Sequence, residues 1–476
     1  MKKKTKKDKK KFRKKFWYFI FQRIPEKWLF YMGLILPDFI KRPLRKYLPK
    51  RPPSNPPYLN WFTLMVLAWQ TLRREGVKVL LYRIKLYHRQ RQNQRSAFSI
   101  QGKPHNPNPS KFSVLFIAPE DNIHSKRYRV DNIIEQLKIE GIKTLSLNTS
   151  QINSNLKELP NYDLWVFFRL GMSPLLATLF RIATQLKIIP ILDFDDYIFD
   201  PKMAKHISLL KKYSHLERKC WIEMMRLYQK SFQTFRYLTL STSFLVKITA
   251  GVGKKSFLIP NGVNQKQIKI SKKALTQRLK KLDRHKALNI GYFSGTQTHQ
   301  RDFEEVAPVL LKILQEFPNV NFCYGGYLDL DKKFSLFPKQ IKKLPFVPWQ
   351  NLPYNLAKID INLAPLELNN PFNEAKSELK YFEAALLKIP TIASATQSFK
   401  DAIKSGRNGF LAEDSSDWYK WLKLLIQNSG LRKKIGEKAF IHTMNNYTPR
   451  VLAPKTKRVY HEIIKDWKEW QRIKNE

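Results

Sequence analysis

Apolar residues follow two alternating patterns along the chain from Ser113 onward. Short, nearly continuous apolar runs predict buried strands, and the stretches between them, with apolar positions every three or four residues, predict amphipathic helices. Regular alternation of the two is typical of parallel sheets with crossover helices. In the first half of this region we expect strands at 113–119, 143–148, 163–168, 188–194, 236–242 and 256–264, and helices at 128–141, 173–186 and 206–234.

The alternation then begins again and predicts a second Rossmann-like domain from Leu288 to Tyr447. Its expected strands are 288–296, 319–326, 344–349, 360–366 and 391–394, and its expected helices are 301–318 and 376–390. The final stretch, Arg450–Glu476, predicts a basic amphipathic helix. The expected fold class is α/β, with two facing Rossmann-like domains and a ligand cleft at the carboxyl ends of their strands.

These patterns divide the chain into four parts. We expect a basic, aromatic-rich extension and linker at 1–110, an N-terminal Rossmann-like domain at 111–262, a C-terminal one at 263–447, and a terminal helix at 448–476. The polar, Pro- and Asn-rich stretch Arg89–Lys111 reads as the linker.

Positive charge is concentrated in the extension. The chain has 87 Lys and Arg against 38 Asp and Glu, and residues 1–110 hold 28 of the former and 4 of the latter, a net charge of +24. Such an excess predicts attraction to nucleic acid or to an anionic membrane. The alternative is a general lysine bias without a specific partner.

The apolar runs of the extension favour the membrane over nucleic acid. Phe16–Phe21 is too short for a signal peptide, and Trp28–Pro37 and Tyr58–Trp69 fall short of the roughly 20 residues that span a bilayer. Short aromatic segments flanked by Lys and Arg suit a helix in the membrane interface. Packing of these aromatics against a neighbouring domain is the main alternative, and nucleic-acid binding comes third, because the aromatics stand in blocks.

Cysteine usage points to a reducing compartment. Cys220 and Cys323 are far apart and form neither a disulfide framework nor a zinc motif. We therefore expect a cytoplasmic protein, associated peripherally with the inner face of the cytoplasmic membrane.

An acidic segment in this basic chain, NEAKSELKYFEAALLKIPTIAS, is the first candidate for chemistry. If it is helical from Lys376, then Lys376, Lys380 and Glu383 share one stripe, and Glu378 lies off it. Lys376 and Ser377 would open the helix, with amides free to receive a phosphate. The alternative is an exposed, salt-bridged helix face.

Two further sets of residues follow strands. Gly295 and Thr296 end the first strand of the second domain, where glycine lets a phosphate approach the backbone, and Arg301 adds a positive fork. The alternative is an ordinary turn. In the first domain, three basic residues expected at the cleft rim would receive an anionic acceptor or complement a diphosphate, unless they form a solvated helix start: His124, Arg127 and Arg129.

Four segments in this order, FLIPNGVN, IGYFSGTQTHQRDF, DINLAPLELNNPFNEAKSELKYFEAALLKIPTIAS and SGRNGFLAED, resemble the retaining GT-B glycosyltransferases of the family-4 type. The resemblance covers about residues 113–447 and includes a K-S-x-x-K-x-x-E segment. It implies a C-terminal domain that binds a nucleotide-sugar as substrate, an N-terminal domain that binds the acceptor, no cofactor and no bound metal. Asn261 and Gly262 would mark the hinge.

The resemblance also implies roles for single residues. Glu383 matches the second glutamate of E-x7-E, which holds the ribose hydroxyls. The first glutamate, which contacts the transferred sugar, has no exact match: Ala375 stands there, and Glu374 or Asn373 would take the role. Arg301 and Lys380 would neutralise the departing diphosphate.

The aspartates after the strand at 188–194 remain on the acceptor side. Asp193-x-Asp195 looks like the metal-binding D-x-D of another glycosyltransferase fold, but the GT-B resemblance argues against a metal here. Asp195 and Asp196 would orient acceptor groups or cap the next helix.

The expected function is transfer of a sugar, hexosyltransferase-like and with retention, to a glycan or lipid-linked acceptor in cell-surface polysaccharide or glycolipid synthesis. Two alternatives stay open: another GT-B activity such as a nucleotide-sugar epimerase, and a non-catalytic basic protein that binds membrane or nucleic acid.

Overall fold

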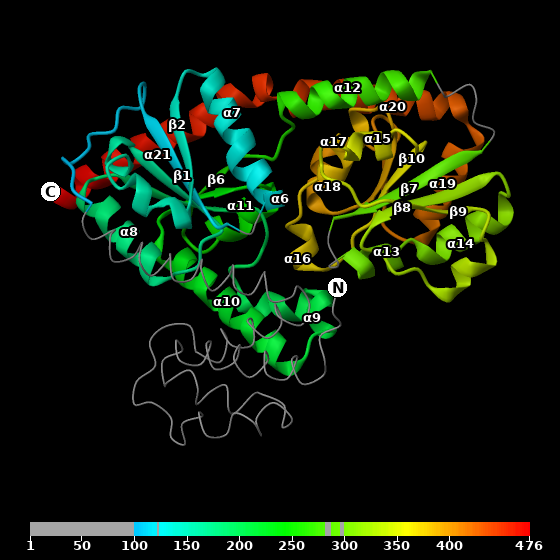
Figure 1. Cartoon of the computed structure of the whole chain (residues 1–476), viewed down its shortest axis with the longest axis horizontal. Helices are drawn as coiled ribbons and strands as arrows, with labels where there is room; N and C mark the ends of the chain where they lie inside the picture. The colour runs from blue at the N-terminus through cyan, green and yellow to red at the C-terminus, as the bar shows by residue number, and fades with distance from the viewer. Residues whose placement is uncertain (1–99, 121–122, 281–286, 296–298) are drawn as a thin grey trace, which may run out of the picture. The chain divides into compact units, whose positions relative to one another are not determined.

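The computed structural model describes residues 100–120, 123–280, 287–295 and 299–476. The chain forms two compact units, Met1–His88 with Tyr213–Met224, and Arg89–Lys212 with Met225–Glu476. Residues 1–99 of the basic extension lie outside the described residues, together with the expectations made for them. The second unit contains both Rossmann-like domains (Figure 1).

The N-terminal domain is built on a six-stranded parallel sheet in the order β2-β1-β3-β4-β5-β6. All six strands predicted from the apolar runs are present. Their bounds are β1 Ser113–Ala118, β2 Lys143–Asn148, β3 Leu164–Phe168, β4 Ile189–Phe194, β5 Tyr237–Leu240 and β6 Lys255–Leu258.

Helices cover both faces of this sheet. They are α6 Ile123–Lys126, a π-helical turn Arg127–Asp131, α7 Asn132–Ile139, α8 Pro174–Gln185, α9 Ser208–Lys211, α10 His215–Thr234 and α11 Ser243–Ala250. Short 3₁₀ turns lie at Thr149–Gln151, Asn153–Asn155, Leu159–Asn161 and Pro201–His206. On one face, apolar side chains of α7 pack on β1, β3 and β4. On the other, Phe167 contacts Phe235, which contacts Phe180 of α8.

The C-terminal domain has a second six-stranded parallel sheet, in the order β12-β11-β10-β7-β8-β9. Its strands are β7 Leu288–Ser294, β8 Val320–Gly326, β9 Ile341–Leu344, β10 Ile361–Ala364, β11 Thr391–Ser394 and β12 Phe410–Ala412. Strands β8 and β9 lie on one side of β7, and β10, β11 and β12 lie on the other. The order in which the chain adds parallel strands to the sheet therefore changes side between β7 and β10. This switch point is where open α/β sheets bind ligands.

Helices also sandwich the second sheet. They are α12 Gln265–Leu279, α13 Gln300–Glu304, α14 Ala307–Glu316, α15 Leu352–Leu356, α16 Pro371–Glu374, α17 Leu379–Ala385, α18 Gln397–Ala402, α19 Ser415–Gln427 and α20 Ser429–Asn446, with a 3₁₀ turn at Lys332–Leu336. Side chains of α13, α14 and α19 share one core with the sheet, whereas those of α12, α15 and α17 meet on the other face.

Three predicted elements of this domain differ in the structure. The strand expected at 344–349 ends at Leu344, because the two prolines that follow cannot donate to a sheet ladder. The helix expected at 301–318 is interrupted between α13 and α14, just before Pro308. The helix expected at 376–390 begins only at Leu379.

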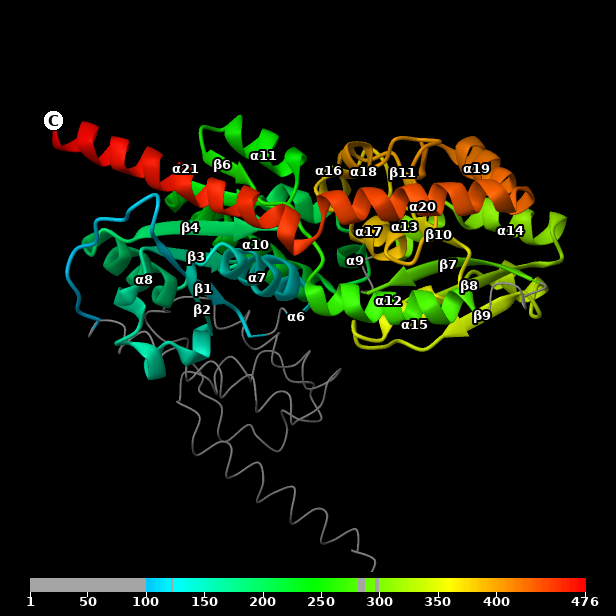
Figure 2. The ribbon, with the colours of Figure 1, turned by 90° about the horizontal axis from the view of Figure 1, so that it is seen from above.

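The last helix returns to the N-terminal domain. Helix α21, Pro449–Asn475, packs along α7, as Figures 1 and 2 show. Its apolar side chains complete the core over β1, β3 and β4 with Tyr460, Ile463, Ile464 and Trp467. The stretch predicted as a separate terminal helix is therefore part of the N-terminal domain's core.

The two chain segments that cross between the domains run side by side. Val263 N donates to the Tyr447 carbonyl at 2.9 Å. A Cβ on Gly262 would lie 2.4 Å from Leu452 Cδ1 and 2.8 Å from the Tyr447 carbonyl oxygen, so glycine alone fits there without a shift. Among the described residues, no helix combines the length and apolar character needed to cross a membrane.

Beside this crossing, Tyr447 Oη donates to Glu378 Oε1 at 2.7 Å. Burial raises the pKa of Glu378 to about 7, above its ordinary value of 4.5. A carboxyl whose pKa is raised on folding favours the folded state most when protonated, and this stability is lost as pH rises from 4.5 through 7.

We therefore expect Glu378→Gln, which keeps an acceptor for Tyr447 but cannot ionise, to gain stability relative to the wild type as pH rises from 5 to 8. The gain in unfolding free energy should be roughly 1–3 kcal/mol, measured by urea denaturation at both pH values. Glu413→Gln, whose carboxylate is 70% exposed, is the control and should show no such trend. A difference between Glu378→Gln and wild type that is the same at both pH values would contradict the assignment.

Candidate functional site

The switch point of the C-terminal sheet is flanked by two loops. Gly295 directly follows β7, and residues 365–373 follow β10. The carboxyl ends of β7 and β10 lie next to each other because the strands are parallel and paired. Polar side chains from both loops therefore meet at one edge of the sheet.

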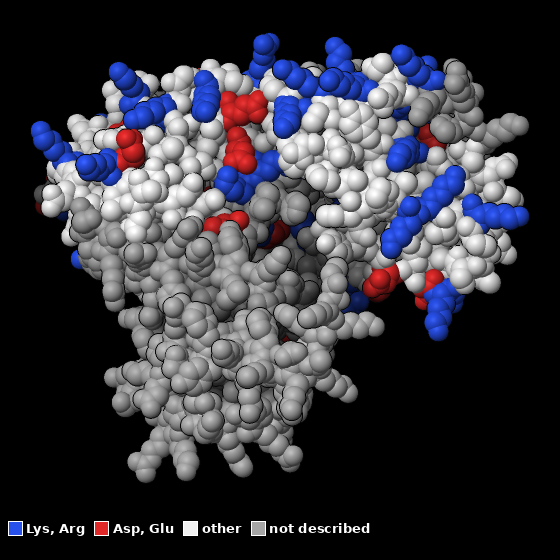
Figure 3. Space-filling model, in the orientation of Figure 1, with Lys and Arg blue, Asp and Glu red and all other residues white. Residues whose placement is uncertain are grey.

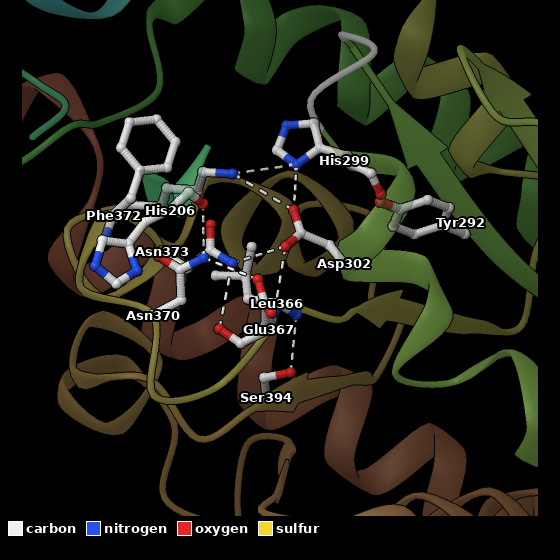
Figure 4. A network of polar contacts seen from close by, with 11 residues as sticks. His206, Tyr292, His299, Asp302, Leu366, Glu367, Asn370, Phe372, Asn373 and Ser394 are labelled. Atoms are coloured by element: carbon white, nitrogen blue, oxygen red, sulfur yellow. Dashed lines mark hydrogen bonds and ion pairs between the residues drawn. The ribbon is translucent and has the colours of Figure 1, made fainter. Parts of the chain in front are cut away.

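The carboxylate of Asp302 is the centre of their contacts (Figure 4). The residue is 3% exposed. Its Oδ2 accepts from His299 Nδ1 at 2.8 Å and lies 3.4 Å from Lys376 Nζ. Its Oδ1 accepts from Asn373 Nδ2 at 2.8 Å and from the backbone N–H of Glu367 at 3.2 Å. One buried carboxylate thus ties the loop after β7 to the loop after β10.

The loop after β10 is also held from both sides. Leu366 N donates to Ser394 Oγ at 2.8 Å. Asn370 Nδ2 donates to Glu367 Oε2 at 2.8 Å and to the carbonyl of His206, in the N-terminal domain, at 3.0 Å. Figure 4 shows these groups converging below Asp302. A small pocket lies here, lined by His206, Ile207, Ser208, Asp302, Glu367, Asn370, Phe372, Asn373 and Lys376.

Two lysines bring positive charge to the same place. Lys376 Nζ lies within ion-pair distance of Asp302. Burial, together with the charge of Lys376, lowers the pKa of Lys380 to about 8. Among the described residues Lys380 forms no ion pair, and Asp302 and Glu383 act on it only through longer-range attraction. A partly buried ammonium without a carboxylate partner favours an anion from outside the chain.

His299 is neutral in this setting. Burial and the charges of Lys376 and Lys380 lower its pKa to about 3. Burial opposes ionisation of Asp302, but the attraction of Lys376 and the hydrogen bond from His299 outweigh it, so the pKa of Asp302 is lowered. Since Asp302 is ionised, His299 Nδ1 must donate, and Nε2 is left as an acceptor.

The segment that carries the lysines is not the single helix expected from the sequence. Helix α16 ends at Glu374 and α17 begins at Leu379, so Lys376 is not helical. The prediction that Lys376 shares one helical stripe with Lys380 and Glu383 was therefore wrong. The charge of Lys376 still acts on Lys380. The non-helical residues between the two helices place Lys376 next to Asp302, which also acts on Lys380.

Gly295, Thr296 and Arg301 were expected to bind the diphosphate, and Gly295 and Arg301 differ from each other in exposure and contacts. Gly295 lies in the open, since a Cβ there would meet no atom within 4 Å. Thr296 lies outside the described residues. Arg301 Nε pairs with Glu367 Oε1 at 2.7 Å and its side chain is 44% exposed. Arg301 is therefore engaged by the loop after β10.

Glu374 and Ser377 make contacts that the sequence did not predict. Glu374 Oε2 accepts from Gln397 N at 2.8 Å, at the start of α18. Ser377 Oγ accepts from Asn261 Nδ2 at 2.8 Å. Asn261, expected at the hinge, thus links the segment between the domains to the lysine-bearing segment.

Glu383, on α17, is reached by three donors from outside the C-terminal sheet. Its Oε1 accepts from Tyr128 Oη at 2.5 Å, from Gln267 Nε2 at 3.2 Å and from Arg127 Nη2 at 3.3 Å. Arg127, expected on the acceptor side, is therefore placed at the carboxylate expected to bind the donor.

Arg129 was expected at the rim of the cleft, but it is 0% exposed. Its Nε and Nη2 donate to the two oxygens of Asp193 at 3.0 and 2.8 Å. Its Nη1 donates to the Ile259 carbonyl at 2.5 Å and to Asn261 Oδ1 at 3.1 Å. Arg129 and Asp193 thus fix the interdomain segment from within, and the guanidinium is closed to an acceptor.

Asp195 and Asp196 lie after β4 and both pair with Arg169, which follows β3. Arg169 has φ 46°, a left-handed conformation that side chains other than glycine rarely adopt. Burial raises the pKa of Asp196, and the charge of Lys376 acts on it in the opposite sense. The carboxylate of Asp196, in the N-terminal domain, therefore lies within electrostatic reach of Lys376.

Four residues that make contacts in the candidate site were not predicted from the sequence: His299, Asp302, Tyr128 and Arg169. His299 and Asp302 stand in the string THQRDF directly after the Gly295 loop, so their polarity next to a strand end was an available signal. The sequence gives no comparable signal for Tyr128 and Arg169, since each is a single residue beside a strand or helix. His124 lies in α6. Within the described residues, no group of His, Cys, Asp and Glu side chains is arranged to hold a metal ion.

Comparison with known proteins gives matches in structure but not in sequence. No family model matches the chain. No curated protein is detectably similar in sequence.

Solved structures, in contrast, share its architecture. HepE of Anabaena, crystallised with UDP, is similar with a TM-score of 0.51 and 12% identity, over 74% of this chain and 100% of HepE. A glycosyltransferase of Rickettsia africae gives 0.52 and 15%, over 75% and 99% of the two chains. Sucrose-phosphate synthase of Thermosynechococcus elongatus gives 0.51 and 10%, over 75% and 100%. The two parallel sheets and these likenesses show that the chain has the GT-B fold.

Proposed function

We propose that this protein is a glycosyltransferase that moves a sugar from a nucleotide-sugar to a glycan or lipid-linked acceptor. The observation that carries the proposal is the pair Lys376 and Lys380, held at the switch point of the C-terminal sheet without enough negative charge to match them. Asp302 serves Lys376, and Lys380 has no ion-pair partner among the described residues. A nucleoside diphosphate supplies the missing charge.

The two lysines act on the leaving group. When the bond between the sugar's anomeric carbon and the diphosphate breaks, negative charge grows on the diphosphate oxygen, and fixed ammonium groups stabilise it. The acceptor hydroxyl forms the new bond to the anomeric carbon, and its proton passes to the departing diphosphate. Retention of configuration is part of the proposal and rests on the resemblance to family-4-type enzymes.

Glu383 is proposed to hold the ribose hydroxyls of the donor, and Asp195 and Asp196 to receive acceptor hydroxyls. Support for the second assignment is the action of Lys376 on Asp196 across the two domains. Among the similar proteins, HepE of Anabaena was crystallised with UDP, which supports a nucleotide as ligand. Synthesis of cell-surface polysaccharide or glycolipid is the proposed setting.

A panel of nucleotide-sugars tests this function. Thermal stabilisation by one nucleotide-sugar, with release of its nucleoside diphosphate that rises when a glycan acceptor is added, is the expected result. Epimerised or free sugar formed at the same rate without an acceptor would favour an epimerase. Binding of no nucleotide at all would overturn the proposal.

Lys380 gives the binding a specific pH dependence. Because the pKa of Lys380 is about 8, the wild type should bind UDP, or the nucleotide that the panel identifies, more weakly as pH rises from 7 to 9. Lys380→Arg remains charged, so its affinity should change less over this range. Lys380→Met should bind about 10- to 100-fold more weakly at pH 7, since charge-assisted hydrogen bonds are worth roughly 1.5–3 kcal/mol.

Calorimetric titration at the two pH values measures these effects. Lys312→Met, at a lysine on α14 that is 60% exposed, is the control and should bind as the wild type does. A Lys380→Met variant with unchanged affinity and melting temperature would show that Lys380 is not at the anion.

We also propose that the protein associates with the inner face of the cytoplasmic membrane through residues 1–110. The support is their net charge of +24 beside short aromatic runs. Figure 3 shows Lys and Arg side chains outnumbering Asp and Glu on the face of the described residues in view. Helix α12 contains no Asp or Glu and adds four exposed lysines: Lys266, Lys269, Lys272 and Lys273.

The full chain should float with liposomes that contain anionic phosphatidylglycerol and not with neutral phosphatidylcholine liposomes. Each Lys or Arg near an anionic surface contributes about 1 kcal/mol, and salt screens the attraction. Binding should therefore fall at 0.5 M salt. Equal flotation with both kinds of liposome, or none, would contradict the membrane proposal and leave the enzymatic one intact.

A further inference from the structure

The contacts of Glu383 cross from one domain to the other. Arg127 and Tyr128 belong to the π-helical turn of the N-terminal domain, Gln267 to α12, and Glu383 to α17. Arg127, Tyr128 and Gln267 all donate to Oε1 of Glu383. Among the described residues, Oε2 receives no hydrogen bond.

Arg127 is fixed independently of Glu383. Its guanidinium lies 4.0 Å from the ring centre of Tyr128 and 4.5 Å from that of Trp349. Its Nη1 donates to Gln267 Oε1 at 3.0 Å, and its Nη2 donates to the Tyr128 hydroxyl. The residue is 8% exposed. Arg127 and Tyr128 therefore present two ordered donors to one oxygen of Glu383.

The π-helical turn explains how neighbouring residues can have such different partners. Arg127, Tyr128 and Arg129 are consecutive and all buried, which a regular surface helix does not permit. Arg129 is anchored to Asp193 inside the N-terminal domain. The turn therefore directs two side chains to the other domain while the third holds it in place. π-Helical turns are often found at functional sites.

Two interpretations of the Arg127–Glu383 contact can be weighed. If the contact were a lock, a donor would have to take Glu383 away from Arg127. Ribose hydroxyls are neutral and cannot replace the lost carboxylate, so Arg127 would be left as a buried, uncompensated charge, which is strongly unfavourable. If the contact is instead a brace, which holds Glu383 in place while the donor binds, the donor uses the free Oε2 and the Arg127–Glu383 ion pair is kept. Donor binding then costs less free energy, because no buried charge loses its partner.

We propose that Arg127 and Tyr128 are positioning residues that hold Glu383 through Oε1, so that Oε2 receives the ribose diol of the donor. The proposal rests on the proposed function and extends it, because a residue pair of the acceptor domain then takes part in donor recognition. Closure of the two domains and binding of the donor's ribose strengthen each other, since both need the same carboxylate in one orientation.

Tyr128 can be tested with little change in shape. Burial and the nearby Glu383 raise the pKa of Tyr128 well above its ordinary value, so the hydroxyl stays protonated and donates. Tyr128→Phe removes that donor and keeps the ring. Tyr419→Phe is a matched control, because its hydroxyl also donates to a glutamate, Glu316 Oε2 at 2.7 Å, on the α14–α19 side of the domain.

The measurement is a ratio of affinities in the full-length protein. UDP, ADP and GDP are titrated beside their 2′,3′-dideoxy forms, which lack the diol, and the pair that the wild type binds is used. The wild type should prefer the diol-bearing nucleotide about tenfold or more, the value of one charge-assisted hydrogen bond. In Tyr128→Phe and Arg127→Gln the preference should fall to about threefold or less, as in Glu383→Gln, and Arg127→Lys should recover part of it.

Each outcome separates the two proposals. If Tyr128→Phe weakens both nucleotides equally, or neither, and keeps the wild-type preference, the hydroxyl serves only packing and the brace is overturned. If the wild type binds nucleotide without any preference for the diol, Glu383 does not hold the ribose, and that assignment falls together with the brace. If no nucleotide binds, the proposed function itself fails. Tyr419→Phe should retain the wild-type ratio, and melting temperatures without ligand identify any variant that has simply unfolded.

Discussion

A buried negative charge, Asp302, organises the candidate site. Two loops of unlike length have to meet at the switch point of the sheet, and each alone would leave polar groups without partners. The carboxylate supplies acceptors for an imidazole, an amide and a backbone N–H, and it offsets part of the charge of Lys376. Its own burial is tolerable only because these donors surround it. The position of Lys376 follows from this one group, and the charge of Lys376, together with burial, lowers the pKa of His299.

A buried ion pair, Arg129 with Asp193, organises the domain boundary. It holds the interdomain segment in place, as Asp302 holds the two loops at the switch point. The guanidinium holds Asn261, and Asn261 holds Ser377 beside the lysines. A chain of polar contacts therefore runs from the interior of one domain to the segment that faces the other. The geometry of the lysines depends on the N-terminal domain as well as on the sheet of their own domain.

Much of the fold could be predicted from the sequence, because apolar period and strand length are local properties. The six strands of the first sheet were all indicated, and the strand at 344–349 failed where prolines override apolar character. The site was harder, because its partners are distant in sequence. Lys376, Lys380 and Glu383 were singled out for a common helical spacing, but only Lys380 and Glu383 lie on one helix, α17. Arg129 looked like a surface cation and is buried, since nothing near it in the sequence indicates Asp193, far along the chain.

The return of helix α21 to the first domain has a consequence for the order in which the protein matures. The core over β1, β3 and β4 includes Tyr460, Ile463 and Trp467, which follow the whole second sheet in the sequence. Of the two Rossmann-like domains, the one that is synthesised first is therefore completed only by residues that are synthesised after the second sheet. Synthesis of α21 is thus a condition for completing the core of the domain that supplies His206, Ile207 and Ser208 to the pocket.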